Sequence, residues 1–387
     1  MTTLSIFDAA SEAGERIGLI DGGNTYSFAS LAEMTAQTTV SHRVAAEPTI
    51  DTVIAIYSAL AAGRRITLIH PRLTSVEREQ LPAPAQGEGA GIIVYTSGSC
   101  AAPKPVLLTP DMLVASAAAN AANLGWRDSD RWLCPLPLAH VGGLSVITRC
   151  LIARRCAALG GVDDLAGITL ASVVPAQLSR MIERDPPRSL RAVLVGGAFA
   201  APALLARARE RGFPVLATYG MTEACSQIAT EREPGDGLVP LNGMELRFVD
   251  GRISVRGPAV AAAFDGHDWL ETGDLGSLDD RGRLVVHGRA DDLIVTGGEN
   301  VHPLEVESAL LALPAVEDAC VFGTPDEQWG EIVTAAVVAS APPDELRRQL
   351  EDKLARFKLP RRFEIADALP RTASGKVDRA AVRRRYG

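Results

Sequence analysis

Apolar residues along the chain fall into short continuous runs that alternate with stretches of helical spacing. The runs at 92–96, 171–174 and 191–197 have the length of buried strands, and the stretch at 204–212 repeats its apolar residues as a helix does. Strands that alternate with helices in this way are typical of α/β layers built on a mostly parallel sheet. The pattern therefore predicts an α/β fold as far as about Pro240.

The segment before these strands predicts a helix followed by a hairpin, with its turn at 21–24. An apolar helix is expected at 50–63 and a buried strand at 66–70. The run at 81–91 is rich in Pro, Gly and Ala without periodicity, which favours a linker. We therefore expect mixed helix and strand up to residue 81 and an irregular connection after it.

The pattern changes after Pro240 to short strands with hairpin turns predicted at 249–252 and 279–282, which indicates a small β subdomain. A fresh succession of helices and strands begins after residue 292. We therefore predict an N-terminal domain over residues 1–289, made of layered α/β sheets and the β subdomain. A small α+β C-terminal domain is predicted over residues 290–387.

Composition narrows the range of functions. The 387 residues include 39 Lys and Arg against 47 Asp and Glu, and this net charge of −8 argues against a protein that coats nucleic acid. Six scattered cysteines without a CxxC pair favour a reducing, cytoplasmic compartment, without disulfides or a zinc site. The first residues lack the order of a signal peptide, and no run of about 18–20 apolar residues occurs, so no membrane insertion is expected.

A loop rich in small polar residues follows the first of the predicted parallel strands. Its hydroxyl, glycine and lysine residues are Thr96, Ser97, Gly98, Ser99 and Lys104. Hydroxyls and backbone N–H groups can surround phosphate oxygens, and a lysine adds positive charge. The order of a Walker A loop is absent, and a plain surface turn is the alternative.

A second polar group follows an apolar strand and consists of Tyr219, Gly220, Met221, Thr222 and Glu223. An aromatic ring, a glycine that permits close approach, a hydroxyl and a carboxylate suit stacking on a base and holding a metal with its phosphate. A strand end with a helix N-cap at Thr222 is the alternative.

Three further segments carry chemistry near the C-terminus: 271–274, 288–300 and 371–376. Asp274 stands on a tight turn and could accept from both hydroxyls of a ribose, although an Asx turn explains it equally. Lys376 lies in a Gly- and Ser-rich loop, where a lysine is usually solvated. Carried by a mobile domain, it could instead neutralise a carboxylate and a phosphate in a transition state.

Together and in this order, the segments resemble the adenylate-forming superfamily of acyl-CoA ligases, peptide-synthetase adenylation domains and luciferases. The likeness runs from about Ile92 to Arg385. It rests on TSGSCAAPKPV, PLPLAHVGG, YGMTE, WLETGD, GRADDLIVTGGENVHPLEVE and LPRTASGK. The resemblance implies a large adenylation domain, a small mobile C-terminal domain, and a site for ATP, Mg²⁺ and CoA.

Residue roles follow from the resemblance by position. It implies phosphate contacts from Thr96, Ser97, Gly98, Ser99, Lys104 and Thr222, and adenine contacts from Gly196, Gly197, Ala198, Tyr219 and Gly220. Glu223 is expected to hold Mg²⁺, and Asp274 to bind the ribose with help from Arg289. Asp291 matches the hinge of the family, and Lys376 matches its catalytic lysine. Some arginines of the basic stretch 353–385 could meet the phosphates of CoA, although a solvated face is the default.

Within the superfamily, YGMTEACSQIAT, GGENVHPLEVE and HVGGLSVITR most resemble the 2-succinylbenzoate–CoA ligases of menaquinone biosynthesis. A dicarboxylate needs a cation for the carboxylate that does not react, and the resemblance places Arg149 there. Ser226 and Gln227 are expected in a polar pocket, and His140 along the acyl tunnel. The alternatives are an exposed helix arginine at 149 and a merely packed ring at 140.

The pattern departs from the superfamily in two places. Cys100-Ala101 replaces Thr-Gly in the phosphate loop and Pro105 replaces Gly, and only about 90 residues precede the loop, so a trimmed N-terminal subdomain is expected. An active ligase is still predicted, with weaker ATP binding as one consequence. The alternatives are a CoA ligase for another aromatic or short acid, a stand-alone amino-acid-adenylating domain, and a non-catalytic ATP- or acyl-binding relative. A monomer and a homodimer both stay open.

Overall fold

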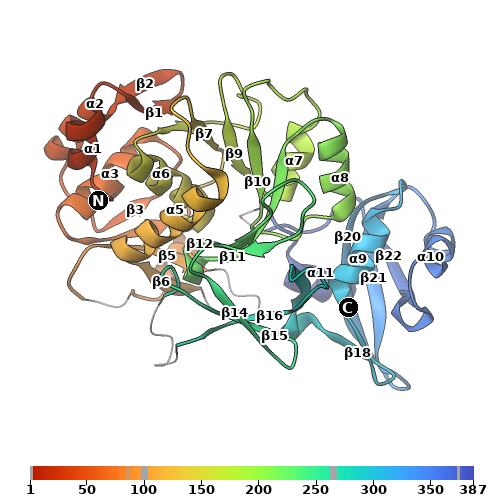
Figure 1. Ribbon diagram of the computed structural model, residues 1–387. Coiled ribbons are helices and arrows are strands. Elements are labelled where there is room, and N and C mark those ends of the chain that lie inside the picture. Colours follow the sequence, from red (N-terminus) through yellow and green to blue (C-terminus); the bar gives the residue numbers. More distant parts are fainter. Residues whose placement is uncertain (1–2, 85–86, 97–102, 262–267, 373–374) are drawn as a thin grey trace. The chain divides into compact units, whose positions relative to one another are not determined.

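The computed structural model describes residues 3–84, 87–96, 103–261, 268–372 and 375–387, which form two compact units (Figure 1). The first unit comprises Met1–Gly197, Ala208–Leu246 and Val255–Leu270, and the second comprises Ala198–Arg207, Arg247–Ser254 and Glu271–Gly387. The units do not follow a single cut in the chain. The boundary expected between residues 289 and 290 therefore stays a prediction.

The largest sheet of the first unit has nine strands in the order β13-β12-β11-β10-β9-β7-β8-β1-β2. The strands are β1 (Ile17–Asp21), β2 (Asn24–Ser27), β7 (Arg131–Cys134), β8 (Cys156–Leu159), β9 (Leu170–Val173), β10 (Ala192–Val195), β11 (Val215–Met221), β12 (Ser226–Thr230) and β13 (Val239–Pro240). Neighbours from β11 to β1 pair in parallel, whereas β2, β12 and β13 pair antiparallel. This confirms the α/β fold with a mostly parallel sheet.

A second sheet of the first unit has the order β3-β4-β5-β6. Its strands are β3 (Arg43–Ala45), β4 (Arg65–Ile69), β5 (Gly91–Thr96) and β6 (Lys104–Leu108). The strands predicted at 66–70 and 92–96 are thereby confirmed. Because β5 and β6 are antiparallel neighbours, the two ends of the predicted phosphate loop meet at the pair Thr96 and Lys104.

Helices alternate with these strands along the chain. They are α1 (Ile6–Ala13), α2 (Phe28–Gln37), α3 (Ile50–Ala61), α4 (Ser75–Glu79), α5 (Pro110–Leu124), α6 (Val141–Ala153), α7 (Pro175–Met181) and α8 (Pro202–Glu210). The side chain of Thr109 caps α5 by accepting from the N–H of Met112, and the helix ends at Gly125, whose φ is 64°. Helix α5 packs against α6, and both contact β12 (Figure 1). Among the described helices, none combines the length and the apolar character that crossing a membrane requires.

The predicted β subdomain is a sheet in the order β14-β15-β16-β17. Its strands are β14 (Glu245–Val249), β15 (Arg252–Arg256), β16 (Leu270–Leu278) and β17 (Leu284–Arg289). Asp250 and Gly251 have φ of 49° and 74°, as a two-residue hairpin turn requires. At the second predicted turn, 279–282, the N–H of Gly282 donates to the carbonyl of Asp279 at 2.9 Å between the antiparallel strands β16 and β17. Both hairpin turns predicted in this sheet are therefore confirmed.

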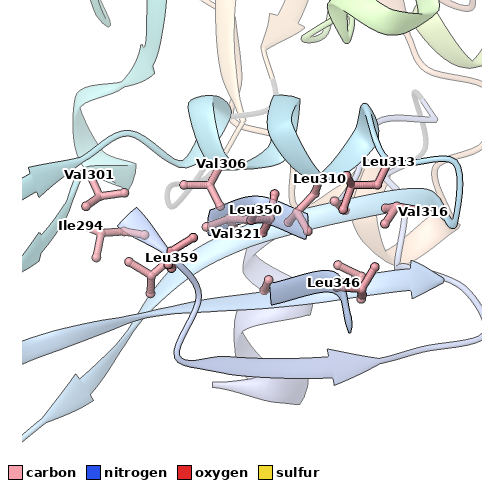
Figure 2. Packing of buried hydrophobic residues seen from close by; sticks show 14 residues of the cluster. Ile294, Val301, Val306, Leu310, Leu313, Val316, Val321, Leu346, Leu350 and Leu359 are labelled. Carbon is pink, nitrogen blue, oxygen red and sulfur yellow. The ribbon is translucent and has the colours of Figure 1, made fainter. Parts of the chain in front are cut away.

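The remainder of the second unit packs helices on a five-stranded sheet. Its elements are β18 (Ile294–Thr296), β19 (Glu299–Val301), α9 (Pro303–Leu311), β20 (Val316–Asp326), β21 (Gly330–Ala339), α10 (Pro343–Glu351), β22 (Arg362–Ile365) and α11 (Arg379–Tyr386), with short 3₁₀ turns at Ala290–Asp292 and Arg356–Lys358. Figure 2 shows Val306 and Leu310 of α9 above Val321 of β20, with Leu346 and Leu350 of α10 in the same apolar cluster. This core gives the small unit its own support.

Candidate functional site

Two predicted segments follow neighbouring parallel strands of the large sheet. Gly196 and Gly197 come directly after β10, and the segment from Tyr219 to Glu223 lies at the end of β11. Strand β10 pairs in parallel with β11, so both segments lie at the carboxyl edge of the sheet. Crevices at this edge are where open α/β sheets bind ligands. Ala198 belongs to the second unit.

Close approach of backbone explains the glycines. A Cβ at Gly220 would lie 1.6 Å from the carbonyl oxygen of Ser226, and one at Gly196 would lie 2.2 Å from Oγ1 of Thr218. Neither position has room for a side chain. The segment from Tyr219 onward is therefore pressed against the start of β12, and its course is fixed by packing.

Beyond β11 the chain makes a 3₁₀ turn at Thr222–Ala224, and Cys225 and Ser226 then have φ of 50° and 98°. Thr222 and Glu223 are half-buried on this turn. The turn contacts β6, which begins at Lys104. The structure thus brings together the end of the predicted phosphate loop and the predicted metal-binding carboxylate. Ser97, Gly98 and Ser99, like Cys100 and Ala101, lie outside the described residues.

Arg149 lies on α6 with only 2% of its surface exposed, so the alternative of an exposed helix arginine is wrong. Its Nη2 donates to Oγ of Ser116 at 3.4 Å, and its guanidinium carbon lies 5.8 Å from the ring centre of Trp132. Its Nε has no hydrogen-bond partner among the residues that the structure describes. Within the described part of the chain, no carboxylate pairs with it. Burial lowers the pKa of Arg149 to about 10.

The other predicted acyl-pocket residues surround the same region. Ser226 accepts a long bond of 3.5 Å from Ser145. Gln227 is buried and uses both ends of its amide within the protein, accepting from Asn120 and donating to Thr230, each at 2.7 Å. Asn120 and Ser116 are absent from the sequence-based set. Their four-residue spacing on an alanine-rich helix was the only signal that they share a face.

His140 stands at the N-terminal end of α6 and is half-buried. Its ring centre lies 4.9 Å from that of His70, a buried histidine that sequence reasoning also missed. Nδ1 of His70 accepts from the backbone N–H of Arg72, and burial lowers the pKa of His70. Two imidazole rings therefore lie together at this end of α6.

In the second unit, Asp274 and Arg289 face each other across β16 and β17. Nη1 of Arg289 donates to the Asp274 carboxylate at 3.2 Å and to the carbonyl of Thr272 at 2.8 Å. Gly273 between them has a φ of 74°, and a Cβ there would lie 2.5 Å from the guanidinium. The pair is thus held in one geometry. Asp291 is exposed on the next 3₁₀ turn.

Lys376 lies on a small hairpin closed by a bridge between Arg371 and Val377. The N–H of Thr372 donates to the carbonyl of Lys376 at 2.8 Å, and Arg371 donates to the carbonyl of Gly375 at 3.0 Å and pairs with Asp318. By accessible area Lys376 is an exposed residue, while desolvation by neighbouring groups lowers the pKa of its ammonium group. These contacts fix the backbone of the hairpin next to Lys376.

Comparison with known proteins connects these features. Residues 33–262 match the model of the AMP-binding enzyme family, and residues 305–376 match that of the AMP-binding enzyme C-terminal domain. A 2-succinylbenzoate–CoA ligase of Bacillus pumilus is 40% identical over 327 residues, which cover 74% of this chain and 67% of that protein. The enzyme of the same name from Bacillus subtilis is 37% identical over 342 residues, covering 78% and 70%.

Solved structures agree with this relationship. The o-succinylbenzoate CoA synthetase (MenE) of B. subtilis, in complex with the acyl-adenylate OSB-AMP, has a TM-score of 0.87 and 31% identity, covering 98% of both chains. The same enzyme with ATP and a magnesium ion has the same TM-score, identity and coverage. Because the family model spans more than half of the sequence and the relatives are matched over two thirds of their length, this chain belongs to the AMP-binding enzyme family.

Proposed function

We propose that this chain is the ATP-dependent 2-succinylbenzoate–CoA ligase of menaquinone biosynthesis, an AMP-forming acid–thiol ligase. Two curated relatives carry this activity in their names, and a solved neighbour holds the corresponding acyl-adenylate. The substrates are the aromatic dicarboxylic acid, ATP and CoA, with Mg²⁺ as cofactor. The observation that favours this acid is that Arg149 is buried and that no described carboxylate pairs with it.

A buried guanidinium without a carboxylate partner is expensive, because desolvation of the charge is not offset. Arg149 is in this state among the described residues, with its Nε left without a partner. An acid with a single carboxylate would present that group to the nucleotide and leave the arginine unmatched. A second carboxylate, remote from the reacting one, supplies the missing charge.

The nucleotide end of the site uses the carboxyl edge of the large sheet. Thr96, Lys104 and Thr222 contact the phosphates, together with Ser97, Gly98 and Ser99. Gly196, Gly197, Ala198, Tyr219 and Gly220 contact the adenine, and Asp274 with Arg289 holds the ribose. A single carboxylate such as Glu223 suits Mg²⁺, which proteins bind through one or two carboxylates while phosphates supply further oxygens. When bound, the ion offsets negative charge on the phosphates.

The reaction proceeds in two steps. A carboxylate oxygen of the acid bonds to the α-phosphorus of ATP as the bond to the β-phosphate oxygen breaks, which gives the acyl-adenylate and pyrophosphate. The CoA thiol then releases its proton to solvent, its sulfur bonds to the acyl carbon, and the bond from that carbon to the phosphate oxygen breaks, so that AMP leaves. Lys376 donates to the oxygens on which charge builds in the first step. His140 lines the acyl side of the site.

The second unit supplies two groups with different tasks. Lys376 is needed for adenylate formation only, and Asp291 lies at the hinge about which the C-terminal domain, residues 290–387, rotates between the steps. Rotation would exchange the lysine for the entering thiol. This division of labour explains how one site serves two reactions.

Pyrophosphate release by the purified chain with ATP, Mg²⁺ and 2-succinylbenzoate, with and without CoA, tests the function. We expect release with the acid and a CoA thioester when CoA is present. Release with another acid only would retain the chemistry and refute the substrate. Nucleotide binding without release for any acid would favour the non-catalytic alternative.

Two finer expectations stay predictions. We propose a cytoplasmic location from the cysteine pattern, and a homodimer in solution with a monomer as the alternative. Light scattering on the purified chain at several concentrations gives the mass directly. A mass near 40.9 kDa at all concentrations would exclude the homodimer.

A further inference from the structure

Helix α5 presents two polar side chains, Ser116 and Asn120, to the start of β12. They lie four residues apart and therefore on one face of the helix. The hydroxyl of Ser116 donates to the carbonyl of Cys225 at 2.7 Å, and Nδ2 of Asn120 donates to Gln227 at 2.7 Å. Both residues are buried, Ser116 with 4% of its surface exposed. This face of α5 is thus hydrogen-bonded to the chain at Cys225 and Gln227, shortly after Glu223.

Ser116 also contacts the acyl end of the site. Its Oγ accepts from Nη2 of Arg149 at 3.4 Å while its O–H donates to Cys225. One hydroxyl therefore connects the buried guanidinium to the backbone two residues after Glu223. Hydrogen bonds that share an atom in this way strengthen each other, because the charge on the arginine polarises the O–H.

The turn at Cys225 and Ser226, to which Ser116 is hydrogen-bonded, is strained. Cys225 and Ser226 both have positive φ without being glycine, a backbone conformation that is unfavourable unless the surroundings hold it. The carbonyl of Cys225 is the atom that Ser116 anchors. A change at this anchor is expected to relax the turn and move Thr222 and Glu223, which precede it.

A serine within a helix has another option for its hydroxyl. It can bond back to the carbonyl four residues earlier, which for Ser116 is that of Met112. Arg149 occupies the acceptor side of the oxygen and thereby directs the O–H toward Cys225. The direction of this hydroxyl therefore depends on where the guanidinium lies.

We propose that Ser116 is a positioning residue that couples Arg149, at the acyl end, to the turn carrying Thr222 and Glu223, at the nucleotide end. The inference rests on the proposed function for the roles of these two ends. By linkage, any group that moves Arg149 changes the affinity for Mg²⁺·ATP, and the reverse holds by the same factor. Binding of the remote carboxylate to Arg149 thereby changes the affinity of the site for the nucleotide.

The test is a double-mutant cycle on the dissociation constant for Mg²⁺·ATP, measured by calorimetry without acid or CoA. Ser116→Ala and Arg149→Met should each weaken binding about fivefold, the size of one lost hydrogen bond. Because they break the same connection, the double variant should also bind about fivefold more weakly, instead of the roughly 25-fold expected for independent sites.

Ser58→Ala is the matched control. Ser58 lies on α3 in the same unit, is equally buried at 4% exposure, and donates to the carbonyl of Thr38 at 3.3 Å. It should leave nucleotide affinity unchanged. If Ser116→Ala does not fold, Ser116→Cys keeps the size with a weaker donor and should show a smaller loss with the same non-additivity.

Additive losses in the cycle, or a loss with Ser116→Ala no larger than with Ser58→Ala, would overturn the coupling. Pyrophosphate release judges the proposed function separately, because the cycle contains no acid. A chain that activates another acid but gives a non-additive cycle keeps the coupling and loses the proposed substrate. A chain that activates 2-succinylbenzoate but gives an additive cycle keeps the function and loses the coupling.

Discussion

Two arginines, the buried Arg149 and the partly buried Arg379, lie one in each compact unit and have opposite surroundings. Arg379 of α11 donates to both carboxylate oxygens of Glu307 at 2.6 Å, with Asp292 at 3.7 Å from its Nε. Arg149 of α6 has a hydroxyl and an indole ring as its neighbours. Burial on its own lowers the pKa of a guanidinium, yet Glu307 raises that of Arg379, whereas the pKa of Arg149 falls to about 10.

The comparison separates two uses of an arginine that is withdrawn from water wholly or in part. Arg379 is already neutralised, so its task is structural: it ties α11 to α9, three residues after Lys376. No carboxylate of the described residues neutralises Arg149, and such a cation is suited to binding an anionic ligand. Charge compensation thus distinguishes a structural arginine from a ligand-binding one. Three experiments on Arg379 and Arg149 test this distinction, and one on the exposed Lys376 tests the cation proposed for catalysis.

The largest effect is expected from the cation that is exposed. Lys376→Ala should slow formation of the acyl-adenylate about 10²–10³-fold, because a donor to the developing charge is lost. Thioester formation from supplied acyl-adenylate and CoA should stay within about threefold of the parent, since the lysine takes no part in that step. Rapid-quench measurement of each half-reaction distinguishes the two. Equal loss in both halves, in a folded variant, would refute the assigned role.

The second effect is on stability. Arg379→Met should lower the free energy of unfolding by about 3 kcal/mol, because Glu307 is left buried and charged without its partner. Arg383→Met, one turn further along α11, removes a half-exposed arginine that lies 3.8 Å from Asp292, and should cost less than about 1 kcal/mol. Urea unfolding of both variants measures the difference. Similar losses would mean that the Glu307 pair is not special.

Sequence alone predicts the local parts of this picture and misses the distant ones. The hairpin turn at Asp250-Gly251 and the strands of the parallel sheet follow from residue type and spacing. Ser116 and Cys225 are 109 residues apart, and Glu307 and Arg379 are 72 apart. The spacing of apolar and polar residues along the chain does not predict contacts between residues so far apart. Arg149 was assigned by resemblance, but whether it was exposed or buried depended on how α5 and α6 pack on β12.

The third effect concerns substrate choice. Arg149→Met should lower kcat/KM for 2-succinylbenzoate about 10–100-fold, the size of a lost charge-assisted hydrogen bond to the remote carboxylate. Benzoate and its uncharged 2-substituted derivatives should change about fivefold at most, through the nucleotide end alone. The ratio of the two kcat/KM values is the decisive number. An unchanged ratio would show that Arg149 does not read the second carboxylate.

The smallest effect completes the comparison with Arg379. Arg149→Met should change the free energy of unfolding by less than about 1 kcal/mol, or raise it, because a costly buried charge is removed and no carboxylate is left unpaired. The methionine fills much of the same volume, so the change reports on charge more than on packing. Urea unfolding without ligands measures it beside Arg379→Met. A loss of unfolding free energy as large as that of Arg379→Met would mean that Arg149 also stabilises the fold. The contrast between an arginine without a carboxylate partner and a neutralised one would then fail.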